Sequence, residues 1–293
     1  MAIKTNEDKL VKISVMGEVS SPVARSAYQI SSDGKPVVLP GVGGITYNQR
    51  VGDPAVGLKA DHVEPGVSIE NKENDPRFKQ APNTALNILA CVGNTAIVVG
   101  GDAKGEKGVV VGKHGGIEHV MVDFSEETME KLVIGDKIQV KAYGVGLELP
   151  DFPEVKIMNT DPDFLEKMKL KEKDGKLIVP VTHIVPAKIM GSGLGADQVY
   201  SGDYDIQLFD EETREEYNLD TLRFGDLVAI MDTDHSFGRI YKKGAVSVCI
   251  IVHSDCVISG HGPGAATLFT SSTGMIEPVI DPEANIAMIL GLR

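Results

Sequence analysis

Histidines are the side chains of this 293-residue sequence best suited to metal or acid–base chemistry, and there are seven of them. Three lie in one stretch, residues 232–264, together with three aspartates and several glycines. Imidazole and carboxylate groups are common ligands of zinc, manganese and iron, and a bound ion lowers the pKa of its water. We therefore predict a divalent metal site there. Its predicted ligands are Asp234, His235, His253 and His261.

Two carboxylates, Glu118 and Asp255, are candidates for the catalytic acid–base group, because each lies close to histidines in the chain. Glycine-containing loops surround both, and loops of that kind let backbones approach one another closely. The remaining candidate cleft residues are His62, His114 and His119. The alternative interpretation is that these are ordinary loop side chains that bind nothing.

Composition limits the classes of function. The formal net charge is −13, with 42 acidic and 29 basic side chains, so the chain repels phosphate backbones and we do not expect nucleic acid as a partner. No apolar run reaches the ~18 residues of a membrane-spanning helix. The three cysteines match no metal-binding spacing, and no apolar signal segment is recognised near residue 1. We expect a cytoplasmic protein with reduced thiols.

Short β-branched runs separated by glycine dominate the pattern, as at residues 96–99, 108–111 and 246–252. The sequence indicates few helices, each by its capping residues. The expected helices begin near Pro82, Ser125, Asp161 and Asp281. The predicted fold class is α+β, predominantly β.

An internal similarity suggests two related modules. Residues 124–128 and 209–213 share the pattern Phe-x-Glu-Glu-Thr, and each is followed by a Gly-Asp turn and an apolar strand. Duplication and coincidence both explain it. We predict two barrel-like or sandwich-like modules, 1–150 and 151–293, the second carrying the His/Asp stretch. Because sheet edges need protection, we also expect a homo-oligomer.

Three resemblances follow from particular stretches. Residues 39–48, 113–124 and 232–264 resemble a prokaryotic family known as domain of unknown function 4438, over nearly the full length. Residues 54–66, with the loops at 114–116 and 259–264, are similar to the acetamidase/formamidase family of metal-assisted amide hydrolases. That family's Gly-Gly-Asn-Met-Asp signature is replaced here by residues 115–119.

The third resemblance is local. Residues 98–110 are similar to the KOW hairpin of ribosomal and transcription-elongation proteins, which implies an SH3-like segment near 94–143. In that family the hairpin contacts RNA or protein.

Three functions therefore stay open at this stage. The first is metal-assisted hydrolysis of a small amide or related polar molecule, through the residues named above. The second is a non-catalytic module that binds a small ligand or a protein. The third is RNA binding through the KOW-like hairpin.

Overall fold

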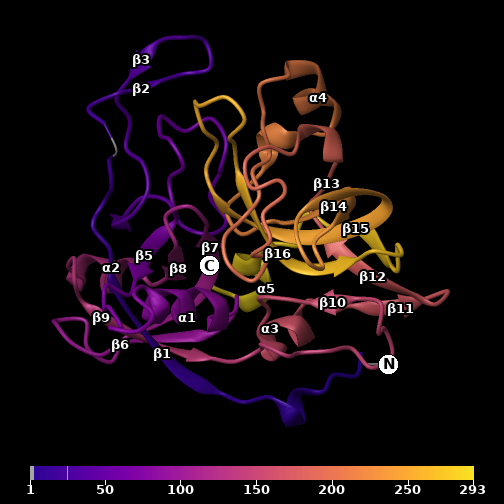
Figure 1. Cartoon of the computed structure of the whole chain (residues 1–293), viewed down its shortest axis with the longest axis horizontal. Coiled ribbons are helices and arrows are strands. Elements are labelled where there is room, and N and C mark those ends of the chain that lie inside the picture. Colours follow the sequence, from indigo (N-terminus) through magenta and orange to yellow (C-terminus); the bar gives the residue numbers. More distant parts are fainter. Residues whose placement is uncertain (1–2, 25) are drawn as a thin grey trace.

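The computed structural model describes residues 3–24 and 26–293. About a third of the chain is strand (35%) and little of it is helix (14%), as the sequence predicted. Figure 1 shows the strands of the first half gathered on one side and those of the second half on the other. None of the helices in the described ranges combines the length and apolar character needed to cross a membrane.

The first half folds into a closed barrel of six strands with a filled interior. The strands follow the order β1–β9–β6–β7–β8–β5, and β5 pairs back with β1 to close it. Alternate side chains such as Val67, Val122 and Val140 point inward and form a separate apolar core, as expected for a small barrel. The barrel strands are β1 (Ile13–Val19), β5 (Gly66–Glu70), β6 (Thr95–Val98), β7 (Lys107–His114), β8 (His119–Asp123) and β9 (Lys137–Ala142).

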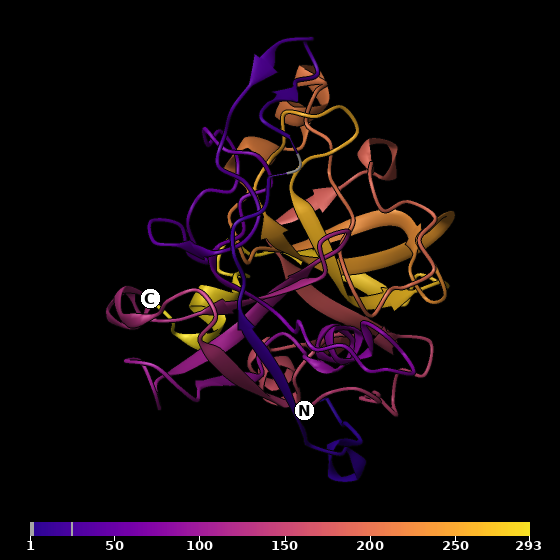
Figure 2. The ribbon, with the colours of Figure 1, turned by 60° about the vertical axis from the view of Figure 1, so that its left-hand side comes forward.

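The segment near 94–143 contributes four of these strands, β6 to β9. A short strand, β4 (Ile45–Thr46), adds to the outer side of β5. The two-residue strands β2 (Gln29–Ile30) and β3 (Pro36–Val37) pair only with each other. In Figures 1 and 2 they form a hairpin that projects away from the barrel.

The second half contains a five-stranded and a three-stranded sheet. Long central strands such as β15 are buried along most of their length, which explains the continuous apolar run at 246–252. The five-stranded sheet contains β10 (Lys156–Ile157), β16 (Gly264–Ser271), β15 (Ile240–His253), β14 (Leu227–Asp234) and β13 (His183–Val185). The other contains β11 (Lys171–Lys173), β12 (Lys176–Val181) and β17 (Ile276–Ile280).

Helices begin mostly where the capping residues predicted. The Ser125 hydroxyl accepts a hydrogen bond from the N–H of Thr128, and the Asp161 carboxylate accepts one from the N–H of Asp163. The helices are α1 (Ala81–Leu89), α2 (Glu126–Lys131), α3 (Pro162–Lys167), α4 (Glu211–Glu216) and α5 (Ile286–Leu290). Short 3-10 turns occupy Glu7–Lys9, Ala187–Ile189 and Leu219–Thr221.

The prediction that the last helix begins at Asp281 was wrong, because it begins at Ile286. The last helix is capped by Asn285, whose side-chain oxygen accepts from the N–H of Ala287. The same side chain donates to Asp226 and to the carbonyl of Phe224, so a tertiary contact fixes the cap. Asp281 instead closes a turn through the N–H groups of residues 283 and 284.

The two similar segments have the same local geometry. Asp136 and Asp226 each accept a hydrogen bond from the N–H three residues earlier and donate their own N–H back to that residue's carbonyl. Each turn leads into a strand, β9 or β14. The similarity of 124–140 and 209–230 is therefore structural as well as sequential over this short unit.

One strand joins the two halves. A bulge in the pairing between Val110 and Gly112 redirects the end of β7 out of the barrel and against β15. At Gly112 the strands approach so closely that a Cβ atom would lie 2.5 Å from Val252. The last residue of β7, His114, is thereby placed beside the last residue of β15, His253.

Candidate metal centre

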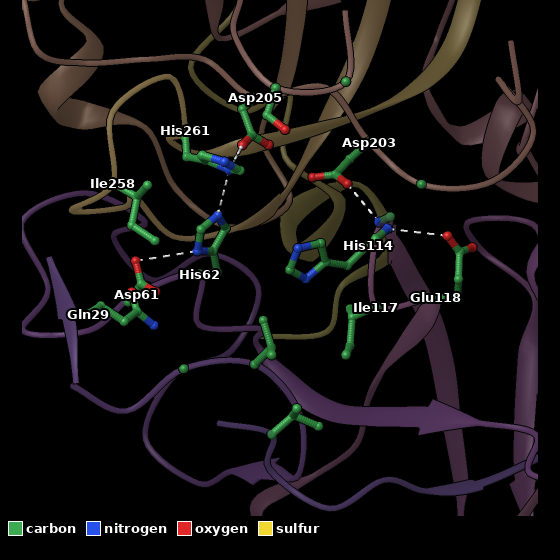
Figure 3. A pocket seen from close by; sticks show the side chains of 18 of the residues that line it. Gln29, Asp61, His62, His114, Ile117, Glu118, Asp203, Asp205, Ile258 and His261 are labelled. Atoms are coloured by element: carbon green, nitrogen blue, oxygen red, sulfur yellow. Dashed lines mark hydrogen bonds and ion pairs between the residues drawn. The ribbon is translucent and has the colours of Figure 1, made fainter. Parts of the chain in front are cut away.

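A cavity of about 850 Å³ opens where the two halves meet. Its walls come from the hairpin of β2 and β3, from the β7–β8 turn and from loops of the second half. Figure 3 shows histidines from both halves turned toward one another at its inner end. Three groups of ligand-type side chains lie there, each with atoms within 4.8 Å of one another. Two of them adjoin, the first with His114, Asp203 and His253 and the second with His62, Asp205 and His261. The third, Asp61, His62 and Cys256, shares His62 with the second, and in it the Cys256 thiol donates to Asp61.

The first group is fully buried. The Nδ1 atom of His253 lies 2.9 Å from the carbonyl of Ser254, so Nδ1–H donates there and Nε2 is the nitrogen that faces the carboxylates. That Nε2 lies at ion-pair distance, 2.7 Å, from Oδ2 of Asp203, but the contact lacks hydrogen-bond geometry, and neither atom has a hydrogen-bond partner among the described residues. Two buried atoms of this kind need a positive charge between them, either a proton on Nε2 or a metal ion. The ring of His114 lies 4.3 Å away between centroids.

The second group adjoins the first and is more open. Nε2 of His62 lies 3.1 Å from Nδ1 of His261, which lies 2.9 Å from Oδ2 of Asp205. The other oxygen of Asp205 lies 3.5 Å from Nε2 of His253, so this carboxylate touches both groups. Figure 3 shows the chain of contacts from Asp61 through His62 and His261 to Asp205.

Outer carboxylates orient two of the histidines. Oε1 of Glu64 lies 2.6 Å from Nδ1 of His114, and Oδ1 of Asp61 lies 3.3 Å from Nδ1 of His62. Both contacts leave Nε2 as the atom available on the inner side. Carboxylates that hold the far nitrogen of an imidazole in this way are typical of histidine metal ligands, because they fix the tautomer and the ring direction.

Glycines allow these segments to converge. A Cβ atom on Gly264 would lie 2.0 Å from Oδ2 of Asp203 and 2.3 Å from the ring of His253. A Cβ atom on Gly115 would lie 3.0 Å from the Cα atom of Gly202, and the N–H of Gly115 donates to Oδ1 of Asp203. The glycine density of the loops at 115–116 and 260–264 therefore has a packing cause.

Opposite charges act against the effect of burial at several of these side chains. Burial would lower the pKa of His253, but Asp203 and Asp205 outweigh it and hold that pKa well above its ordinary value. Burial lowers the pKa of His62. Burial would raise the pKa of Glu64, yet hydrogen bonds with His114 and His119 keep that pKa well below the usual range. A divalent ion would replace the proton that His253 holds.

Of the predicted site residues, the structure brings four together: His62, His114, His253 and His261. His119 lies behind them, with Nδ1 3.0 Å from Glu64, and does not line the cavity. Burial would lower the pKa of His119, but Glu64 raises it.

Glu118 lines the cavity from the β7–β8 turn, where its φ is 60° and its carboxylate accepts from the N–H of Gly116. Asp255 does not line it. Its Oδ2 atom accepts from the N–H of Gly57 and its carbonyl from the N–H of His62, so it supports the loop that carries His62.

The structure does not bring Asp234 and His235 to this centre. Antiparallel pairing sets Asp234 against Ile240, the first residue of β15, whereas His253 is the last. Asp234 accepts two bonds from Ser236 in a local turn. Neither Asp234 nor His235 belongs to any ligand-type group found among the residues described.

Sequence reasoning missed Asp203 and Asp205. They lie in a loop between Ile189 and α4, far in the chain from the histidines. Their signal is the alternation Asp-Tyr-Asp, which places both carboxylates on one side of an extended segment while Tyr204 points into the core. Asp205 pairs in an isolated bridge with Gly264, and that long-range contact supplies the position.

Comparisons with known proteins agree with the resemblance over the whole chain. The models of DUF4438, a domain of unknown function, match residues 28–166 with the N-terminal part and 167–290 with the C-terminal part. The crystal structure of TM1086 is 47% identical, covers 98% of this chain and 99% of its own, and superposes with a TM-score of 0.92. A comparison with curated proteins gave no significant match. The chain therefore belongs to the DUF4438 family.

Proposed function

We propose that this protein is a metal-dependent hydrolase that acts on a small amide or related polar molecule. The observation that carries the proposal is the contact of Nε2 of His253 with Oδ2 of Asp203, two buried atoms 2.7 Å apart and without hydrogen-bond partners. Once the proton on Nε2 is lost, both atoms offer lone pairs, and His114 belongs to the same group. A divalent ion satisfies all three at once.

The donor set favours particular ions. Neutral imidazoles with carboxylates suit zinc, manganese and iron. Two adjoining three-residue groups, with Asp205 of one lying 3.5 Å from His253 of the other, are also the ligand supply expected of a two-metal centre, in which ions lie ~3.5–4 Å apart. When bound, such ions polarise a carbonyl and make hydroxide available near neutral pH.

The chain's own residues supply the remaining tasks. Asp61 and Glu64 keep Nε2 of His62 and His114 turned inward. We assign proton transfer to Glu118, the carboxylate on the cavity wall that is held by no cation among the described side chains. The amide as substrate rests on the likeness of residues 54–66 and of the two glycine loops to the acetamidase/formamidase family.

A second candidate is a non-catalytic module that binds a small ligand. The observation in its favour is the apolar character of part of the cavity wall, where Val38, Leu39 and Ile258 lie. Ligand cavities without catalysis are lined in the same way. The hydrolase requires a bound metal ion, whereas the binding module does not.

The deciding experiment is elemental analysis by inductively coupled plasma mass spectrometry. The protein is purified without chelator or metal-affinity resin, and His253→Ala is compared with the matched control His235→Ala, which removes an equally buried histidine. We expect near-stoichiometric zinc, manganese or iron in the wild type and in His235→Ala, and little in His253→Ala.

A wild type that stays folded and metal-free after incubation with each ion would refute the metal-dependent function and favour the binding module. A metal-loaded protein is next assayed on small amides, with Glu118→Gln as the variant. We expect turnover to fall ~10²-fold or more in that variant while metal content stays unchanged. Equal turnover would remove Glu118 from the mechanism.

A further inference from the structure

We propose that the molecule bound in this cavity carries an anionic group, a carboxylate or a phosphate, which Arg239 holds while the other end faces the histidines. The inference rests on the proposed function for the role of that other end, and it names the class of substrate. Arg239 directly precedes β15 and lines the same cavity as Asp203 and His261.

The side chain of Arg239 is buried and poorly satisfied. The residue is 3% exposed. Its Nη2 donates to the carbonyl of Ser201 at 3.3 Å, while Nε has no partner among the described residues. No carboxylate of the described chain lies within ion-pair distance, 4.0 Å, of this guanidinium. Five N–H groups in a planar fork are therefore mostly unused.

The other buried arginine among the described residues has a carboxylate partner. Arg50, 9% exposed, binds Asp123 with both Nε and Nη2, at 3.0 and 2.6 Å. A buried cation without such a partner is costly, because desolvation is not repaid. The exception at Arg239 is located where a ligand can reach it.

Asp203 and Asp205 do not serve as the counter-charge of Arg239 once a metal ion is bound. Burial lowers the pKa of Arg239, and Asp203 and Asp205 are among the charges that act against this. Both carboxylates are ligands in the proposed centre, so a divalent ion neutralises them. The guanidinium then lacks a counter-charge, and an anionic ligand provides it.

The guanidinium of Arg239 and the proposed metal ligands lie close together in the cavity, so one small molecule can contact both. A Cβ atom on Gly193 would touch the backbone of Asp203 and lie 3.6 Å from Nη1 of Arg239, so the guanidinium lies beside the segment that carries the metal ligands. Ile117 and Ile258 line the same space and favour an apolar portion. An amide with an apolar body and an acidic end, such as an N-acyl amino acid, has these features.

The test compares charged and uncharged ligands that share one metal-binding end. Hydroxamates chelate divalent ions through that end. Isothermal titration calorimetry measures the binding of succinic monohydroxamate and of butyrohydroxamate, which has the same chain length without the carboxylate. The phosphonate analogue, 3-phosphonopropanohydroxamate, distinguishes a phosphate from a carboxylate preference. The proteins are the metal-loaded wild type, Arg239→Gln and the control Arg77→Gln, an exposed arginine outside the cavity.

We expect one of the two charged hydroxamates to bind the wild type and Arg77→Gln about tenfold or more tightly than the uncharged one. In Arg239→Gln this advantage disappears, while metal content and butyrohydroxamate affinity do not change. An advantage that persists in Arg239→Gln, or that is absent from the wild type, overturns the inference.

Failure of the proposed function gives a different result. If the wild type holds no metal and no hydroxamate binds, benzoate and inorganic phosphate are titrated into the metal-free protein. Binding that is lost in Arg239→Gln supports the anion site without a hydrolase, and no binding refutes the anion site as well.

Thermal unfolding is a separate readout. Because the substitution removes an unpaired buried cation, Arg239→Gln should unfold at the same or a higher temperature than the wild type. A lower unfolding temperature would indicate that Arg239 has a structural role instead.

Discussion

Two histidines of the second half, His235 and His253, are both fully buried, yet the charged groups around them shift their pKa values in opposite directions. His253 meets two carboxylates, and these raise its pKa against the effect of burial. His235 meets the hydroxyl of Thr267 and the edge of Tyr204, and burial lowers its pKa to about 3, with Arg239 acting in the same direction.

The comparison shows what distinguishes a candidate metal ligand from a buried histidine of the core. Nε2 of His235 also lacks a hydrogen-bond partner, but no second donor atom faces it in any ligand-type group of the described residues. Nε2 of His253 faces Asp203 and Asp205. Burial and an unsatisfied nitrogen are therefore insufficient. Convergence of several lone pairs from distant segments is the feature that points to an ion.

The largest effect is expected from closing the space around His253. Gly264→Ala would place a Cβ atom 2.0 Å from Asp203 and 2.3 Å from His253, both of which are confined. We expect unfolding free energy to fall by about 2–4 kcal/mol and metal to be lost. Urea denaturation measures the first and elemental analysis the second.

The control is Gly100→Ala, because nothing lies within 4 Å of a Cβ atom there. If Gly264→Ala is as stable as this control and still binds metal, the close packing at His253 is not what positions the ligands.

A smaller effect is expected when the outer carboxylate is altered. Glu64→Gln keeps the shape but loses the charge that holds Nδ1 of His114. Metal affinity should fall about 10–100-fold, as for other outer-sphere partners of histidine ligands. Competition with a chromophoric chelator measures it. Glu70→Gln, at the far end of the strand β5 that follows Glu64 and partly exposed, should leave the affinity unchanged. Equal affinities in the two variants would mean that His114 needs no carboxylate, or is no ligand.

The smallest effect concerns the acid sensitivity of His235. Its folded pKa, about 3, is below the ordinary value of 6.5, so the unfolded chain takes up a proton first as pH falls. Stability is therefore lost progressively below pH 6.5, by about 1 kcal/mol between pH 6 and 5. Urea denaturation of metal-free protein at the two pH values should show that His235→Gln lacks this portion of the loss. Identical pH dependence in both proteins would show that His235 is not buried in neutral form.

Much of the fold was predictable because its signals are local. The helix starts at Ser125 and Asp161 depend on side chains that bond to N–H groups two or three residues away. The strands at 96–99 and 246–252 follow from β-branched runs. The last helix was misplaced because its cap, Asn285, is chosen by contacts with residues near 224–226, which no local pattern contains.

The candidate site was predictable in its residue types and not in its assembly. His253 and His261 were predicted as ligands, and His62 and His114 as cleft residues, from their settings in loops and turns, and the structure brings these four side chains together. The bulge that turns β7 toward β15 and the bridge of Asp205 to Gly264 decide which of these side chains meet. Both features depend on contacts between residues that are far apart in the sequence. Asp234, although part of the predicted stretch 232–264, lies elsewhere because antiparallel pairing sets it against the opposite end of β15.

The crossing of β7 against β15 has a consequence for inheritance. The segment matched by the N-terminal family model holds His62 and His114, and the segment matched by the C-terminal model holds the other four members of the two groups. Neither segment encodes a complete set, so a gene fragment that carried one of them alone would code for an incomplete centre. Both segments must therefore be inherited together for either group of side chains to form.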